Sequence, residues 1–329
     1  MENTRKKQRN TESLTRLAFF PIENPQLETF YHEQKNTFWT PQEIDYSEDR
    51  PQFDRLDEDT KKYVKFILFL FAQLDGIVSE NLCEHFKHET SVFAKECGMF
   101  YSMQEAIEWV HNETYSLLIK TLIKDPEEQE RGLNSIKHFP QIANIADWCY
   151  SYMDPELNLL ERVVAFICVE GVIFSSAFAG IYWLKRKNIL PGVTKANEFI
   201  ARDEGLHTKF GVSLFHHITK KWKVMERLSQ EKVHEVIKSA VSVTETFTRE
   251  AMNCHLVGID AEEMIKYVKR TADVVCESLN YGTIYNVKNP FDWMAIISLP
   301  NKSNFFESTP TEYAREKEDE FVFDKNTPF

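Results

Sequence analysis

Two Glu-x-x-His motifs carry the side chains of this sequence best suited to bind a metal ion. One runs from Glu108 to His111 and the other from Glu204 to His207, and both stand in apolar, helix-like segments. Residues three apart in a helix lie on one face, with Cβ atoms about 5–6 Å apart. Each motif therefore presents one carboxylate and one imidazole to the same site, a donor set that suits iron or manganese.

An acidic residue precedes each motif by nearly the same distance. Asp75 lies 33 residues before Glu108, and Glu170 lies 34 residues before Glu204, each within an apolar run. A helix pair that offers one carboxylate and then Glu-x-x-His thus occurs twice. This is the arrangement found in ferritin-like bundles that bind two metal ions. The repeat predicts a dinuclear metal site between long helices.

The four carboxylates of this pattern need compensating positive charge if they are buried together. Each would cost several kcal/mol to transfer from water, and they would repel one another. Two divalent ions balance them, and the lack of thiolates in the pattern argues against a structural zinc site. A third Glu-x-x-His, from Glu231 to His234, lies in a charged run, so we interpret it as a solvent-facing helix surface.

Long amphipathic helices are the elements that must position these ligands. Apolar residues recur at helical spacings, and no sustained period-two alternation predicts strands. We therefore expect an all-α fold, a ferritin-like long-helix bundle with the di-metal carboxylate site in its core. Between shorter pieces, the predicted helices cover residues 52–88, 101–128, 155–187, 193–220, 225–255 and 260–284.

The two ends of the chain differ from this helical region. Residues 1–20 are expected to form a flexible N-terminal arm, and residues 21–306 the helical domain. Residues 307–329 are charged and lack a helical stripe, so we expect a mobile C-terminal tail.

Composition and charge argue against several classes of function. The 329 residues can bury a sizeable core, and the net charge of −12 disfavours binding to nucleic acids. Six cysteines without a Cys-x-x-Cys pair indicate reduced thiols and a cytoplasmic protein. The N-terminus has no secretory signal pattern. No uninterrupted apolar run reaches about 18 residues, so we expect no membrane contact and interpret Val163 to Leu184 as a buried helix.

With these motifs the sequence resembles a known family, the small subunit of class I ribonucleotide reductase. The resemblance runs from about Phe20 to Phe306 and is closer to the eukaryotic and large-DNA-virus branch than to the common bacterial branch. It implies a radical-generating subunit of ribonucleoside-diphosphate reductase, an oxidoreductase that is active only with its large subunit. Four segments carry the resemblance: Asp75 to Val78, Glu108 to Tyr115, Val169 to Gly171 and Arg202 to His207.

The resemblance assigns each metal ligand to one of two iron ions per chain. Asp75, Glu108 and His111 would hold one ion. Glu170, Glu204 and His207 would hold the other, and some of these carboxylates would bridge the two. Manganese shares these ligands and is the alternative metal.

The resemblance also implies a radical site. Tyr115 lies four residues after His111 on the same helix face and matches the family's radical tyrosine. Phe174, Phe178 and Ile200 match the apolar pocket that shields the radical. On spacing alone, Tyr115 would more often be a core ring with a satisfied hydroxyl than a radical site.

A route for the radical follows from the same resemblance. Asp203 would accept a hydrogen bond from His111 and connect to Trp39, as carboxylates commonly orient metal-bound histidines. Spacing alone leaves Trp39 open as an aromatic anchor in a loop. Tyr313, in the tail, would relay the radical between subunits.

The implied partners are the large subunit, a second copy in a homodimer, O2 and an electron donor. The tail would dock on the large subunit, since acidic residues interleaved with Phe can fold into an apolar groove. Its ending, Asn326 to Phe329, departs from the more acidic ending of eukaryotic relatives and suggests a matched partner.

Three other functions share parts of this pattern. An iron-storage protein or ferroxidase of the ferritin-like superfamily uses the same ligands, but such proteins are usually one short bundle that assembles into a shell. A di-iron oxygenase needs a substrate cavity, and we expect Phe174 and Phe178 to fill that space. A helical scaffold without metal is the third alternative, which a metal analysis would distinguish.

Overall fold

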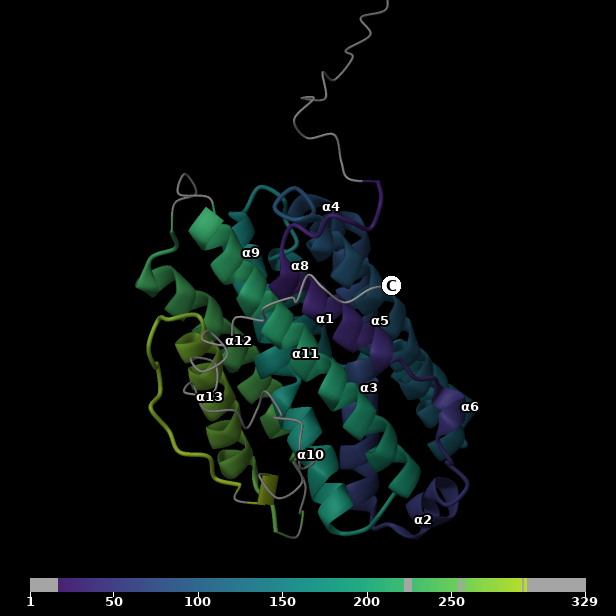
Figure 1. Ribbon diagram of the computed structural model, residues 1–329. Helices are drawn as coiled ribbons and strands as arrows, with labels where there is room; N and C mark the ends of the chain where they lie inside the picture. Colours follow the sequence, from purple (N-terminus) through teal and green to yellow (C-terminus); the bar gives the residue numbers. More distant parts are fainter. Residues whose placement is uncertain (1–16, 222–226, 254–255, 257, 292, 295–329) are drawn as a thin grey trace, which may run out of the picture.

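The computed structural model describes residues 17–221, 227–253, 256, 258–291 and 293–294. Tyr313 and the whole predicted tail lie outside these residues. Within them, every regular element is helical, and none is a strand (Figure 1). The expected all-α, ferritin-like class is confirmed.

The first half of the chain contains the two long helices that carry Asp75 and the first Glu-x-x-His motif. Its elements are α1 (Pro25–Asn36), the 3-10 turn η2 (Pro41–Glu43), α2 (Asp49–Arg55), α3 (Glu58–Asn81), the π-helical turn η3 (Leu82–Phe86), α4 (Lys87–Thr90), α5 (Lys95–Leu122), α6 (Pro126–Leu133), α7 (Ser135–His138) and α8 (Pro140–Ser151).

The second half of the chain again has a helical run that carries one acidic residue, followed by a long helix that carries a Glu-x-x-His motif. Its elements are α9 (Leu159–Cys168), the π-helical turn η4 (Val169–Ile173), α10 (Ser175–Arg186), α11 (Pro191–Lys221), α12 (Gln230–Ala251) and α13 (Ala261–Ser278). The turn η4 joins α9 and α10 into one nearly continuous helical run, and Glu170 lies within it. A π-helical turn inside such a run frequently marks a functional site.

The long helices lie side by side around one apolar core (Figure 1). Helix α3 packs along α5, and α11 packs against the run formed by α9, η4 and α10. Helix α1 crosses the outside of this arrangement and touches both α5 and α11, while α12 and α13 cover the α9–α10 side. The elements that carry the predicted ligands therefore surround one interior space.

Side-chain caps explain several helix ends that the sequence pattern misplaced. The predicted helix 52–88 is broken, because Leu56 is extended and the Asp57 carboxylate accepts a 2.8 Å hydrogen bond from the backbone N–H of Thr60, which starts α3. The predicted helix 101–128 ends at Leu122. Asp125 caps a new helix, α6, whose first residue is Pro126.

The predicted helix 225–255 begins at Gln230, because the Ser229 side chain caps it, and 260–284 ends at Ser278. Beyond α13, buried Asp273 holds the following loop by accepting hydrogen bonds from the backbone N–H groups of Ile284, Tyr285 and Val287. The chain leaves the helix there because this carboxylate satisfies three backbone donors of the loop.

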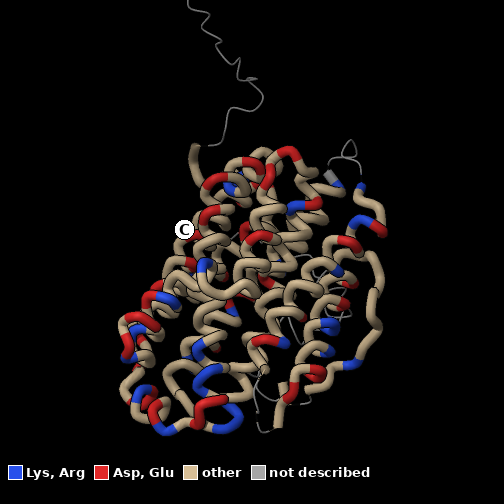
Figure 2. The backbone as a smooth tube through the Cα atoms, turned by 180° about the vertical axis from the view of Figure 1, so that it is seen from behind, with Lys and Arg blue, Asp and Glu red and all other residues tan. Residues whose placement is uncertain are grey.

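Two helical stretches are long and apolar enough to pass a membrane-span test, Glu58–Thr90 and Leu159–Arg186. The apolar windows of these stretches are 78% and 100% buried inside the protein, respectively. Core helices pass the same test, so the expected burial of Val163 to Leu184 is confirmed. Lys and Arg are interspersed with Asp and Glu over the molecule (Figure 2).

Candidate metal centre

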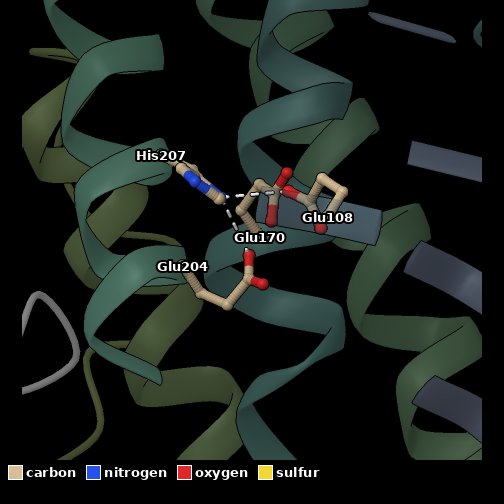
Figure 3. Close-up of side chains that lie close together, drawn as sticks. All are labelled: Glu108, Glu170, Glu204 and His207. Atoms are coloured by element: carbon tan, nitrogen blue, oxygen red, sulfur yellow. Dashed lines mark hydrogen bonds and ion pairs between the residues drawn. The ribbon is translucent and has the colours of Figure 1, made fainter. Parts of the chain in front are cut away.

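Four elements bring the six predicted ligands to one interior site. Asp75 comes from α3, the first Glu-x-x-His motif from α5, Glu170 from η4, and the second motif from α11. All six side chains are buried. Figure 3 shows four of them converging, and their donor atoms all lie within 4.8 Å of one another: Glu108, Glu170, Glu204 and His207.

The two imidazoles face the carboxylates through their Nδ1 atoms. His207 Nδ1 lies 3.1 Å from Glu108 Oε1 and 3.3 Å from Glu204 Oε2. His111 Nδ1 lies 3.0 Å from Glu204 Oε1 and 3.4 Å from Glu108 Oε2. Each histidine therefore contacts both motif glutamates, and the two Glu-x-x-His motifs form one site.

The far nitrogen of each ring is held by a second residue. His111 Nε2 lies 3.3 Å from Asp203 Oδ2, and His207 Nε2 lies 3.0 Å from Gln34 Oε1. Hydrogen bonds at the far nitrogen fix the tautomer and orientation of a metal-bound imidazole, which leaves Nδ1 free to act as a ligand. The sequence predicted the Asp203 contact but not the contact with Gln34 on α1.

Several carboxylate oxygens of the site make no hydrogen bond although they are fully buried. Both oxygens of Asp75 and Glu170 Oε2 are in this state, whereas Glu108 Oε2 and Glu204 Oε1 face Nδ1 of His111. An uncompensated buried carboxylate is costly, so such a group of oxygens requires cations. The residues fit a pair of divalent metal ions with oxygen and imidazole ligands.

The pKa shifts of the buried acids also indicate that the site needs positive charge. Burial raises the pKa of the Asp75 carboxyl well above its usual range, and the charge of Glu108 raises it further. Burial also raises the pKa of Glu170, and the charge of Glu204 adds to this shift. Without metal ions, therefore, protons take up part of the negative charge.

Glu204 and the histidines form the charged part of the cluster. Burial would raise the pKa of Glu204, but hydrogen bonds with Glu170 and both imidazoles hold it well below its usual value. Burial would lower the pKa of His207, but hydrogen bonds to Glu108 and Glu204 raise it to about 9. At His111, hydrogen bonds to Asp203 and to these glutamates likewise outweigh burial and raise the pKa.

Gln104 is a site residue that sequence reasoning missed. It lies one turn before Glu108 on α5, and its Nε2 donates to Glu108 Oε1 at 3.2 Å and to Glu170 Oε1 at 3.0 Å. The amide ties the η4 carboxylate to the α5 carboxylate. Its i−4 position relative to Glu108, on the same helix face, is the signal that could have found it.

Asp203 joins His111 to Trp39. The indole Nε1 of Trp39 donates a 2.8 Å hydrogen bond to Asp203 Oδ2, the oxygen that also faces His111. The Trp39 and His111 rings stack with centroids 6.2 Å apart. Arg202 donates to the other oxygen of Asp203 and to the backbone carbonyl of Thr37, which anchors the loop that carries Trp39.

Tyr115 lies fully buried in an aromatic cluster. Its ring stacks face to face on Phe71, with centroids 4.6 Å apart and an interplanar angle of 4°. Phe71 in turn contacts Phe174 and Phe178, and Ile200 on α11 is also buried. The Tyr115 hydroxyl donates a 2.7 Å hydrogen bond to Asn197 Oδ1.

The third Glu-x-x-His motif, on α12, has a different setting. Glu231 is exposed, and His234 Nε2 lies 3.0 Å from the backbone carbonyl oxygen of Tyr281. This agrees with its interpretation as a surface segment.

Comparisons with known proteins agree with this geometry. The family model described as "Ribonucleotide reductase, small chain" matches residues 16–290. The sequence is 40% identical over 305 residues to a ribonucleoside-diphosphate reductase small chain of Trypanosoma brucei brucei, covering 93% of this chain and 88% of that protein. It is 39% identical over 300 residues to the corresponding protein of Nicotiana tabacum, covering 91% of this chain and 89% of that protein.

A solved structure shares the fold as well. A ribonucleotide reductase homodimer from Saccharomyces cerevisiae aligns with a TM-score of 0.70 at 25% identity, covering 92% of this chain and 90% of that one. The two sequence relatives are eukaryotic, in agreement with the branch that the motifs resemble.

Proposed function

The chain belongs to the ribonucleotide reductase small-chain family, as a small subunit of ribonucleoside-diphosphate reductase, and we propose that it generates a stable tyrosyl radical on Tyr115. The observation that carries this proposal is the position of Tyr115: it lies buried on α5, one helical turn beyond His111 of a di-metal site. The radical would then support reduction of ribonucleotides to deoxyribonucleotides on the large subunit.

Two iron ions per chain are the proposed metal content, with manganese as the alternative. Asp75, Glu108 and His111 would hold one ion, and Glu170, Glu204 and His207 the other. Their unpartnered buried oxygens and inward-facing Nδ1 atoms support a pair of metal ions, and the division between the two ions rests on the family resemblance. When bound, a pair of ferrous ions would supply, with O2, the oxidising power that Tyr115 needs.

The residues around Tyr115 would protect the radical. Phe71 covers one face of its ring, and Phe174 and Phe178 pack against Phe71. Such packing excludes water from the phenol oxygen, and it fills the space in which an oxygenase would need to bind a substrate. Tyr115 itself would give up one electron and its hydroxyl proton.

We further propose that the radical equivalent leaves the site through His111, Asp203 and Trp39. The shared Asp203 oxygen and the buried indole give a continuous hydrogen-bonded path from a metal ligand towards the surface. Tyr313 would continue this path between subunits. The C-terminal tail, residues 307–329, would dock on the large subunit of a cytoplasmic complex in which this chain is a homodimer, with an external electron donor.

Reconstitution with the large subunit tests the proposal. Wild type and Tyr115→Phe would be loaded with iron, exposed to O2, and assayed for deoxyribonucleotide formation. The variant is expected to bind as much iron as wild type and to have no activity. Full activity of Tyr115→Phe at equal iron content would contradict the assignment of the radical site.

A further inference from the structure

The hydroxyl group of Tyr115 has a specific partner on another helix. It donates a 2.7 Å hydrogen bond to Oδ1 of Asn197, which lies on α11 seven residues before Glu204. Both side chains are buried, at 0% and 1% exposure. The polar end of the tyrosine is therefore oriented by α11, the helix that also carries the second Glu-x-x-His motif.

The amide of Asn197 is itself held in one orientation. Its Nδ2 donates a 2.9 Å hydrogen bond to the backbone carbonyl oxygen of Val193, one turn earlier on α11. A carbonyl can only accept, so the NH2 group must face Val193 and the amide oxygen must face the phenol. A carboxamide is neutral and not basic, so Asn197 accepts the hydrogen bond of Tyr115 but cannot take its proton.

The surroundings of the Tyr115 ring strengthen the effect of its hydrogen bond to Asn197. Phe71 stacks on the tyrosine, and Phe174 and Phe178 pack against Phe71, so an aromatic cluster covers one face of the ring. Tyr115 is fully buried, and the nearby carboxylates of Asp75, Glu108 and Glu204 act on it through their charge. In such surroundings a hydrogen bond has a stronger electrostatic effect than in water. The amide oxygen of Asn197 thus fixes the direction in which the phenolic hydrogen points.

We infer that Asn197 is a positioning residue for Tyr115 that holds the phenolic hydrogen while the tyrosine is reduced. The inference rests on the proposed function and extends it. On oxidation Tyr115 would lose one electron and one proton to O2. Two ferrous ions and the external electron donor would supply the other three electrons of the four that O2 accepts, and solvent would supply the remaining protons needed to form water. The phenol oxygen then has no hydrogen, and the fixed amide offers it only another acceptor. Asn197 therefore favours the reduced tyrosine and makes the radical a stronger oxidant.

Isotope-edited infrared spectroscopy tests the hydrogen bond without metal. Full-length metal-free protein would be labelled with ring-4 ¹³C tyrosine, and subtraction of the Tyr115→Phe spectrum would isolate the C–O stretch of Tyr115. Asn197→Leu has a similar volume but no acceptor, and it should shift this band to that of a phenol without a hydrogen bond. Asn197→Asp keeps an acceptor oxygen and should keep the band of a hydrogen-bonded phenol.

Asn112→Leu is the matched control. Asn112 lies on α5 near Tyr115 but donates to the backbone carbonyl of Ala72, so its replacement should leave the Tyr115 band in place. Circular dichroism would establish that each variant is folded, and Asn197→Ala would replace Asn197→Leu if the latter is not. An unchanged Tyr115 band in a folded Asn197→Leu or Asn197→Ala variant would overturn the inference.

A second measurement tests the redox consequence. In iron-loaded protein exposed to O2, the radical of Asn197→Leu should decay more slowly than that of wild type, as followed by electron paramagnetic resonance. Equal or faster decay would overturn the effect on oxidising strength. The infrared result requires no radical, so a shifted band in a protein that forms no tyrosyl radical would contradict only the proposed function.

Discussion

Trp39 and Asp203 lie 164 residues apart in the sequence, and a 2.8 Å hydrogen bond joins the indole Nε1 of one to Oδ2 of the other in the protein interior. The same carboxylate oxygen faces Nε2 of His111, and Arg202 holds the second oxygen. One side chain thus fixes the orientation of a predicted metal ligand and connects it to a buried indole.

Asp203→Asn should separate radical formation from radical use. The amide has nearly the same shape but removes the negative charge between His111 and Trp39. We expect Tyr115 to be oxidised while ribonucleotide reduction with the large subunit falls by about 10- to 100-fold, the usual effect of losing a residue that supports a metal ligand. Trp39→Phe, which lacks the indole N–H, should show the same separation. Full activity in both variants would rule out this path.

The two kinds of Glu-x-x-His motif provide a matched comparison of metal binding. Replacing Glu204 and His207 together by alanine should abolish the stoichiometric binding of two ions per chain. The same double replacement at Glu231 and His234, which lie on the surface of α12, should leave the metal content unchanged. Metal analysis after anaerobic loading measures both. Equal metal loss in the two double variants would mean that the motif on α11 is not a ligand pair.

Metal loading should release protons. The pKa of His207 is about 9, and those of the buried Asp75 and Glu170 carboxyls are raised, so metal-free protein at pH 7 holds protons that ligation must displace. Calorimetry of ferrous ion binding in buffers of different ionisation enthalpy should show a net release. Binding should strengthen as the pH rises towards 9. A binding enthalpy that is independent of the buffer would contradict these protonation states.

The metal-free protein should respond to pH in the opposite direction. The pKa of His207 is raised from 6.5 to about 9 by folding, so its stabilising contribution is fully present below pH 6.5 and is lost as the pH rises through 9. The free energy of unfolding of metal-free protein should therefore fall over this range, whereas bound metal ions should remove the effect. Denaturant titrations between pH 6 and 9, with and without metal, would measure both curves.

Asp49, which is not one of the predicted metal ligands, offers a second pH effect. Burial raises the pKa of this carboxyl to about 6, although it accepts a 3.0 Å hydrogen bond from the backbone N–H of Gly192 at the start of α11. Its contribution to stability is present below pH 3.8 and is lost as the pH rises through 6. Asp49→Asn keeps an acceptor oxygen and should be more stable than wild type at pH 7 by about 2 kcal/mol. Thermal unfolding at pH 4 and pH 7 measures the difference, and an equal effect at both would contradict it.

The sequence predicted those parts of the site that rest on local spacing. The Glu-x-x-His motifs and their upstream acids follow from helix geometry, and their approach follows from the repeated helix pair. Gln34 could not be predicted in the same way, because it reaches His207 from 173 residues away on a short, polar helix. Asn197 lies among helix-forming residues with no signal that its amide would face Tyr115.

The fold shows the same division between local and tertiary causes. Long apolar stripes predicted the main helices, but the ends depend on single caps such as Asp57 and Asp125, which compete with a continuing apolar pattern. The π-helical turn around Glu170 could not be predicted from the sequence either, because its extra residue per turn is set by packing and not by composition.

Electron paramagnetic resonance tests the central claim most directly. Wild type and Tyr115→Phe would be loaded anaerobically with ferrous iron, checked for equal metal content, exposed to O2 and frozen. The account predicts a tyrosyl radical signal in wild type that is absent from Tyr115→Phe. The absence of an organic radical from wild type carrying two irons per chain, or an undiminished tyrosyl signal in the variant, would contradict it.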